Sequence, residues 1–160
     1  MVRNPYEDDL GNRDPLEAMS ETPGRIQAIV SALPAEDLER SDALGKWTLR
    51  QLLVHLAQTE LALPLRARMA LTQKGYVAQP FDQNDWMAAE SHLDGATALA
   101  AYLSVRRMNL QFFSALSPSA RETAFHHPEY GEITIDWLMR QIAGHELHHL
   151  RHFEAVARQR

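Results

Sequence analysis

Residues 134–156 read TIDWLMRQIAGHELHHLRHFEAV, and this stretch decides the fold. Its side chains repeat at intervals of three and four residues, which is the spacing of an amphipathic α-helix. The following residues share one face: Ile135, Leu138, Ile142, His145, His149 and Val156. An amphipathic helix gains most of its stability when other elements cover its apolar face. The stretch therefore predicts a long helix that begins at Thr134 and packs against other helices.

Three other stretches have the same helical periodicity. The first spans residues 14–33, with a kink or a restart expected at Pro23, because proline removes a backbone donor. The second spans residues 48–75 and should bend at Pro64. The third spans residues 94–116. Its predicted core-facing stripe consists of Leu99, Leu103, Arg106, Leu110 and Phe113. No segment alternates polar and apolar residues for more than a few positions, so no strand is predicted.

The pattern predicts an all-α protein, a four-helix bundle within a single domain of residues 1–160. A chain of this length matches one ordinary domain. About twenty residues connect the second and third helices, which is long for a tight antiparallel turn. This connection argues against a plain up-down-up-down order.

Composition excludes several classes of function. The chain has 16 Lys and Arg against 21 Asp and Glu, a net charge of −5, so it lacks the basic surface that binds nucleic acid. It contains no cysteine, which excludes disulfides and thiolate ligands. No apolar run approaches the ~20 residues that span a bilayer, and the polar, acidic start does not resemble a signal peptide. We therefore expect a cytoplasmic protein that binds neither nucleic acid nor membrane.

Four of the eight histidines lie between positions 145 and 152. His145 and His149 are four residues apart on the apolar face, and two imidazoles at this spacing can reach one metal ion. His55 lies on the apolar face of the second helix and is the natural third ligand. The alternative is that buried histidines hydrogen-bond to backbone groups or to one another, which would also satisfy them.

The histidines fit a second metal-site pattern less well. Residues 145–149 also match the H-E-x-x-H metalloprotease pattern, but only eleven residues follow, so a third ligand must come from upstream. His148 and His152 are expected on a solvated face near the helix C-terminus. Three more histidines are expected in loops or on the surface, namely His92, His126 and His127.

Three separated motifs resemble those of the DinB/YfiT-like superfamily of metal-dependent enzymes. They are residues 47–56 (WTLRQLLVHL), residues 127–134 (HPEYGEIT) and residues 143–149 (AGHELHH). The resemblance covers most of the chain and implies an up-down-down-up four-helix bundle. It also implies a metal site made of His55, His145 and His149, the same three residues that the spacing indicates.

The resemblance implies a site rather than a substrate. The leading hypothesis is a metal-dependent enzyme acting on a small molecule, either a hydrolase or a transferase that uses a low-molecular-weight thiol. The alternative is a non-enzymatic module that binds a metal or another ligand. Zinc or nickel is expected, and imidazole ligands also accept iron or copper. Glu146 is the nearest candidate general base in the sequence.

A homodimer is also expected. Relatives of this fold commonly form pairs, and the chain has methionines beyond the needs of one core. The candidates for an exposed apolar patch are Met87, Met108 and Met139.

Overall fold

The computed structural model describes residues 2–159. Its elements in chain order are α1 (Glu7–Leu10), α2 (Pro15–Ala32), the short 3-10 helix η1 (Ala35–Glu39), α3 (Leu49–Thr72), α4 (Gln83–Ala89), α5 (Gly95–Ser114), α6 (Pro118–Arg121), β1 (Ala124–His127), β2 (Gly131–Thr134) and α7 (Ile135–Arg158). The four long helices α2, α3, α5 and α7 lie within about three residues of the predicted boundaries.

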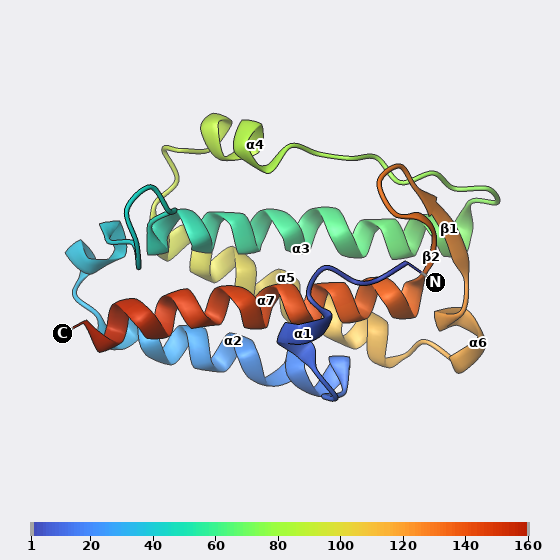
Figure 1. The fold of residues 1–160 in the computed structure, drawn as a ribbon, viewed down its shortest axis with the longest axis horizontal. Helices are drawn as coiled ribbons and strands as arrows, with labels where there is room; N and C mark the ends of the chain where they lie inside the picture. The colour runs from blue at the N-terminus through green and yellow to red at the C-terminus, as the bar shows by residue number, and fades with distance from the viewer. Residues whose placement is uncertain (1, 160) are drawn as a thin grey trace.

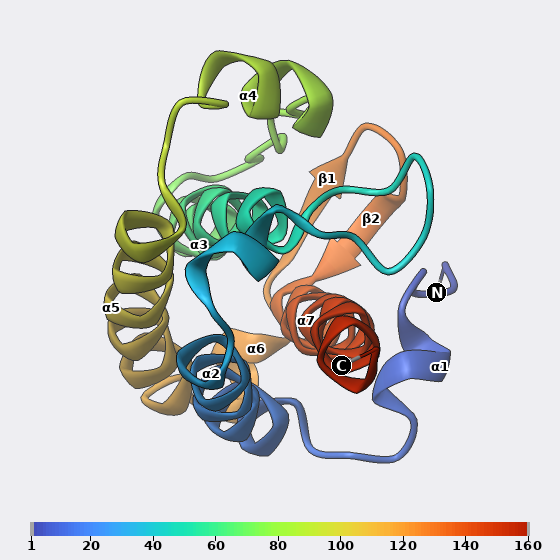
Figure 2. The ribbon, with the colours of Figure 1, turned by 90° about the vertical axis from the view of Figure 1, so that its left-hand side faces the viewer.

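These four helices form a bundle with up-down-down-up order. Figure 1 shows α2 and α7 running toward one end of the molecule, and α3 and α5 running toward the other. The most extensive contacts are between α3 and α5 and between α2 and α7, so each pair of close neighbours is parallel. Because α3 and α5 are parallel, the chain must run from the end of α3 back along the whole bundle before α5 begins. The connection through α4 does this along the outside of α3 (Figures 1 and 2). The predicted fold is confirmed.

The long helices begin where capping side chains predict. Asp14 accepts a hydrogen bond from the Glu17 backbone N–H at 2.9 Å, which satisfies a donor in the first turn of α2. Thr48 and Gln51 form a reciprocal capping box at the start of α3. The Thr134 hydroxyl accepts the backbone N–H of Trp137 and caps α7. Asp94 likewise accepts the Thr97 backbone N–H at the start of α5, so local sequence fixes where all four bundle helices start.

Both internal prolines lie inside continuous helices, so the restart considered at Pro23 does not occur. Pro64 has no N–H to donate to the carbonyl of Glu60 one turn earlier. Asn109 of α5 replaces that donor, with its Nδ2 2.9 Å from the Glu60 carbonyl oxygen. A neighbouring helix thus satisfies the acceptor that the proline leaves free.

The prediction that the chain has no strand is wrong. β1 and β2 pair antiparallel, with Phe125 opposite Ile133, and join α6 to α7. Phe125 and Ile133 are buried, whereas their neighbours in each strand point outward. Gly131 has φ = +70°, a backbone conformation that favours glycine in the turn. Each strand has only four residues, which is too short for a clear alternating pattern.

The buried face of α5 also differs from the prediction. Tyr102, Arg106 and Asn109 are at most 4% exposed, whereas Leu99 and Leu103 are only partly buried. The helix therefore turns several polar side chains inward. The predicted apolar stripe was right at Phe113 and at Arg106, and it missed Tyr102 and Asn109.

Several large apolar side chains are exposed, among them Leu61, Leu65 and Met108. Of the three methionines expected in an exposed patch, Met87 and Met139 are buried in the core and only Met108 is exposed. Formation of a homodimer stays a prediction. Within residues 2–159, none of the helices combines the length and the apolar character that a membrane crossing requires.

Candidate metal centre

Three histidines meet between α3 and α7. The Nε2 atom of His145 lies 2.9 Å from Nε2 of His55 and 3.0 Å from Nε2 of His149. The possible ligand atoms of the three rings all lie within 4.8 Å of one another. One ring comes from α3, and two come from positions i and i+4 of α7. The structure thus brings together the three histidines that the spacing and the family resemblance single out.

These imidazoles are neutral near pH 7. Burial lowers the pKa of His55 from 6.5 to about 4. Burial, together with the neighbouring histidines, lowers the pKa of both His145 and His149 well below 6.5. A neutral imidazole has one nitrogen with a free lone pair, and this is the form that binds a metal.

The cluster fits a divalent cation. A neutral imidazole has a single N–H, so three facing Nε2 atoms that present lone pairs repel one another. The Nδ1 atoms of His55 and His149 are buried and have no hydrogen-bond partner in residues 2–159. Zn–N bonds of about 2.0–2.1 Å in tetrahedral geometry separate the nitrogens by about 3.3 Å. The Nε2 separations are only slightly shorter, so a cation could lie between the rings with small movements of the side chains.

Two aromatic side chains pack against the cluster. The ring of Trp47 lies 4.9 Å from that of His55, and the ring of Tyr6 lies 5.1 Å from that of His145. Tyr6 comes close because residue 144 is glycine: a Cβ atom there would lie 2.7 Å from Tyr6 Cβ and would overlap the Tyr6 backbone oxygen. The Trp137 indole donates a hydrogen bond to the Val2 carbonyl and helps to hold this N-terminal segment on α7.

Two cavities adjoin the cluster. One, of about 380 Å³, is lined by His55 and His145, and the other, of about 400 Å³, is lined by His149. Tyr6, Gln83 and Asn84 line both, so the N-terminal segment and the start of α4 lie at their common boundary. Cavities of this size accept small molecules.

The first cavity also has two buried polar side chains that sequence reasoning missed or misplaced. His127, expected at the surface, is only 4% exposed, because its ring packs on Tyr130 and its Nδ1 accepts the backbone N–H of Glu129. Arg66 was not predicted as a site residue. It follows His55 by eleven residues, which is about three helical turns, so both residues point to the same side of α3. That spacing is the signal that could have found it.

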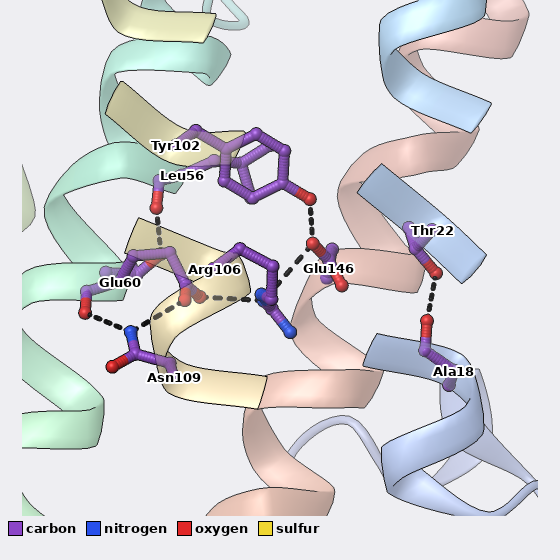
Figure 3. Close-up of polar contacts among 9 residues, drawn as sticks. Ala18, Thr22, Leu56, Glu60, Tyr102, Arg106, Asn109 and Glu146 are labelled. Atoms are coloured by element: carbon purple, nitrogen blue, oxygen red, sulfur yellow. Dashed lines mark hydrogen bonds and ion pairs between the residues drawn. The ribbon is translucent and has the colours of Figure 1, made fainter. Parts of the chain in front are cut away.

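Glu146 is not part of the three-histidine cluster. The residue is fully buried, and its carboxyl group points toward α5, where it accepts a hydrogen bond from the Tyr102 hydroxyl. Arg106 Nη2 lies 3.1 Å from Glu146 Oε1 and 2.7 Å from Glu60 Oε1 (Figure 3). Burial, followed by the nearby charge of Glu60, raises the pKa of Glu146 well above its usual value. We therefore assign the ionised partner of Arg106 to Glu60. The predicted role of Glu146 as general base stays a prediction.

The remaining histidines of α7 pack beside His149, with ring centroids 5.4 Å away for His148 and 5.8 Å away for His152, and each also contacts an acidic residue. His148 Nδ1 lies 3.5 Å from an Asp9 carboxylate oxygen, and His152 Nδ1 lies 2.6 Å from one of Asp42. Both side chains are partly exposed. His92 and His126 are exposed as predicted.

The sequence matches a family model described as the DinB superfamily over residues 18–153. It is 27% identical over 146 residues to a protein of Oceanobacillus iheyensis named "Putative metal-dependent hydrolase OB0782". The match covers 91% of this chain and 85% of that protein. A second protein of the same organism, with a name of the same kind, is 28% identical over 131 residues, covering 81% of this chain and 76% of the relative.

Solved structures have the same fold. YfiT from Bacillus subtilis, described as a probable metal-dependent hydrolase with an unusual four-helix bundle topology, superposes with a TM-score of 0.83 at 22% identity. The similarity covers 91% of this chain and 85% of YfiT. A mycothiol-dependent maleylpyruvate isomerase superposes with a TM-score of 0.70 at 16% identity, covering 93% of this chain and 60% of the isomerase. At these identities the likeness concerns the fold.

Proposed function

The chain belongs to the DinB superfamily, and from this premise we propose that it is a metal-dependent enzyme whose divalent cation is held by His55, His145 and His149. The observation that carries the proposal is the convergence of three neutral imidazoles on one point. The substrate is a small molecule bound in the adjoining cavities.

The residues around the site contribute to metal binding in different ways. Burial keeps the three imidazoles neutral and ready to ligate. Trp47 and Tyr6 restrict the orientation of His55 and His145. A bound divalent cation with three protein ligands supplies Lewis acidity that can activate water or stabilise a thiolate at an open position. Zinc or nickel suits the imidazole donors, and iron or copper would also bind to them.

Two reactions are compatible with this site, hydrolysis and transfer of a low-molecular-weight thiol. The names of the Oceanobacillus relatives support the first, and the thiol-dependent isomerase of the same fold supports the second. The two reactions differ in their second reactant, which is water in one case and a thiol in the other. Assays of metal-loaded protein with and without added thiol separate them. Metal binding without turnover would favour the alternative of a non-enzymatic binding module.

Elemental analysis of purified protein tests the metal site. We expect about one divalent cation per chain in the wild type, because three protein ligands are enough to hold a catalytic metal ion whose remaining position is taken by water or substrate. His149→Ala should lose the metal, since only two imidazoles remain. His148→Ala is the matched control on the same helix and should retain it.

Two results would contradict the metal site. Loss of the cation in His148→Ala with retention in His149→Ala would mean that the wrong face of α7 was assigned. Absence of any bound cation, even after incubation of the wild type with zinc or nickel, would refute the proposal.

A further inference from the structure

A buried arginine and a buried histidine lie beside each other in the wall of the 380 Å³ cavity. Arg66 is 6% exposed and His127 is 4% exposed, and both line the cavity together with His55 and His145. The guanidinium Nη1 lies 3.2 Å from the imidazole Nε2. The second guanidinium nitrogen, Nη2, donates to the Gln79 carbonyl at 2.9 Å. The pair is therefore fixed by the fold.

The contact between the two side chains leaves one donor without an acceptor. Nδ1 of His127 faces the backbone N–H of Glu129 at 3.2 Å, and Nε2 faces Arg66. A neutral imidazole accepts at only one nitrogen, and burial lowers the pKa of His127, which disfavours its charged form. When Nδ1 accepts the backbone N–H, Nε2 carries a hydrogen that points at another donor. One oxygen with two lone pairs could satisfy both N–H groups.

The guanidinium also has no close counter-ion. No carboxylate oxygen lies within 4.0 Å of Arg66 in the described part of the chain, whereas the equally buried Arg106 has two such contacts. Burial lowers the pKa of Arg66, and Glu129 opposes this shift only weakly, because its side chain is exposed and hydrogen-bonds with Tyr130. The Tyr130 phenol is neutral, since burial raises its pKa to about 12. A buried cation without an ionic partner is costly to a fold, so an anion from outside would be bound favourably.

We propose that Arg66 and His127 form a carboxylate-binding subsite, and that the substrate is a small organic acid whose reacting group extends toward the three histidines. This inference rests on the proposed function and deepens it by assigning a substrate class to the same cavity. A guanidinium is matched in shape to a carboxylate. The Phe81 ring lies 6.0 Å from the Arg66 guanidinium carbon, and Tyr130 stacks on His127 at 4.7 Å, so the carbon skeleton of the acid would lie among aromatic rings.

Calorimetric titration with benzoate tests the subsite, with benzamide as the neutral analogue. Benzoate should bind to the wild type at least about tenfold more tightly than benzamide, because charge-assisted hydrogen bonds are stronger than neutral ones. Arg66→Gln should weaken benzoate binding by about tenfold or more. Arg107→Gln removes the same charge from an exposed position of α5 and should change nothing. Equal binding of benzoate to Arg66→Gln and to the wild type would overturn the subsite.

The same titration on chelator-treated protein separates this inference from the proposed function. Benzoate should still bind without metal, because Arg66 and His127 belong to the chain. If benzoate binds only to metal-loaded protein, then the cation and not Arg66 is the anion site, and the inference is wrong while the metal site stands. Tighter binding of inorganic phosphate than of benzoate would also overturn the carboxylate assignment.

Imidazole ¹⁵N spectra of the wild type provide a test that does not depend on the folding of a variant. The subsite requires His127 to carry its hydrogen on Nε2, and benzoate should shift that resonance. A hydrogen on Nδ1, or an Nε2 signal that benzoate does not move, would contradict the subsite.

Discussion

Two clusters of buried polar side chains share α3 and α7 but differ in charge and in access. The three-histidine cluster is neutral and adjoins two cavities. The second cluster, which we call the charged cluster, consists of Glu60, Tyr102, Arg106, Asn109 and Glu146. Its members line neither of these two cavities. Consecutive residues of α7, His145 and Glu146, belong to different clusters, because one step along a helix rotates the side chain by about 100°.

The difference in charge between the two clusters indicates that one contributes to stability and the other to ligand binding. Arg106 is a buried cation, and α3 supplies its counter-charge through Glu60 at 2.7 Å (Figure 3). A buried charge that loses its partner is strongly destabilising. The histidines carry no charge, so the bundle tolerates their unpaired nitrogens at a lower cost, and they remain free to accept a cation. We therefore expect mutations of the charged cluster to reduce stability and mutations of the histidines to reduce metal binding.

The largest expected effect is that of Arg106→Met. This variant leaves the Glu60 carboxylate without its counter-charge in the protein interior, and we expect the free energy of unfolding to fall by about 3–5 kcal/mol. Urea denaturation measures the loss. Arg107→Met is the control, since this side chain is exposed and its removal should change stability by no more than about 0.5 kcal/mol. Similar results for the two variants would mean that the Arg106 ion pair contributes little.

The second effect concerns acid stability of metal-free protein. The pKa of His55 falls from 6.5 to about 4 on folding, so between these pH values the unfolded chain binds more protons than the native one. Stability should therefore decrease as the pH is lowered through this window, by about 3 kcal/mol for His55 alone. Denaturation of chelator-treated protein at several pH values measures the slope. His55→Gln should flatten it, and an unchanged slope would contradict a neutral, buried His55.

The long helices and the three histidines could be predicted because the relevant signals are local. Capping residues such as Asp14 and Thr48 act within one turn, and the spacing of His145 and His149 sets their common face. His55 required one further assumption, that the apolar faces of two helices meet. A bundle fold supplies that assumption.

The residues that sequence reasoning missed depend on contacts between distant segments. Arg66 is buried because Gln79, in the connection after α3, and His127, at the end of β1, lie against it. Tyr102 and Asn109 are buried because they contact Glu146 and Glu60 on other helices. A prediction from hydrophobic periodicity places most polar residues at the surface. The predicted buried face of α5 was therefore centred on leucines such as Leu99 and Leu103 and left out Tyr102 and Asn109.

The third prediction tests the close packing of the N-terminal segment beside the three-histidine cluster. Gly144→Ala places a methyl group against Tyr6, so α1 must move away from α7. We expect a net loss of about 1–2 kcal/mol in urea denaturation, because steric strain exceeds the helix propensity gained. Gly24→Ala in α2 is the matched control. No heavy atom lies within 4 Å of its added Cβ in the described chain, so it should stabilise the protein by up to about 1 kcal/mol. Stabilisation by both substitutions would show that the N-terminal segment is not tightly docked.

The smallest expected effect is that of Glu146→Gln. It tests which of the two carboxyl groups of the charged cluster, Glu60 or Glu146, carries the negative charge beside Arg106. Burial and the charge of Glu60 raise the pKa of Glu146 well above its usual value, which favours the neutral carboxyl, and an amide of the same shape replaces that form closely. The glutamine oxygen can still accept the Tyr102 hydroxyl, and we expect a loss of no more than about 1 kcal/mol. Glu60→Gln instead leaves Arg106 uncompensated and should cost about 3 kcal/mol or more. Urea denaturation of the two variants at pH 7 measures the difference. Equal losses would mean that both carboxyl groups are ionised beside Arg106, and loss of bound metal in Glu146→Gln alone would link this residue to the three-histidine cluster after all.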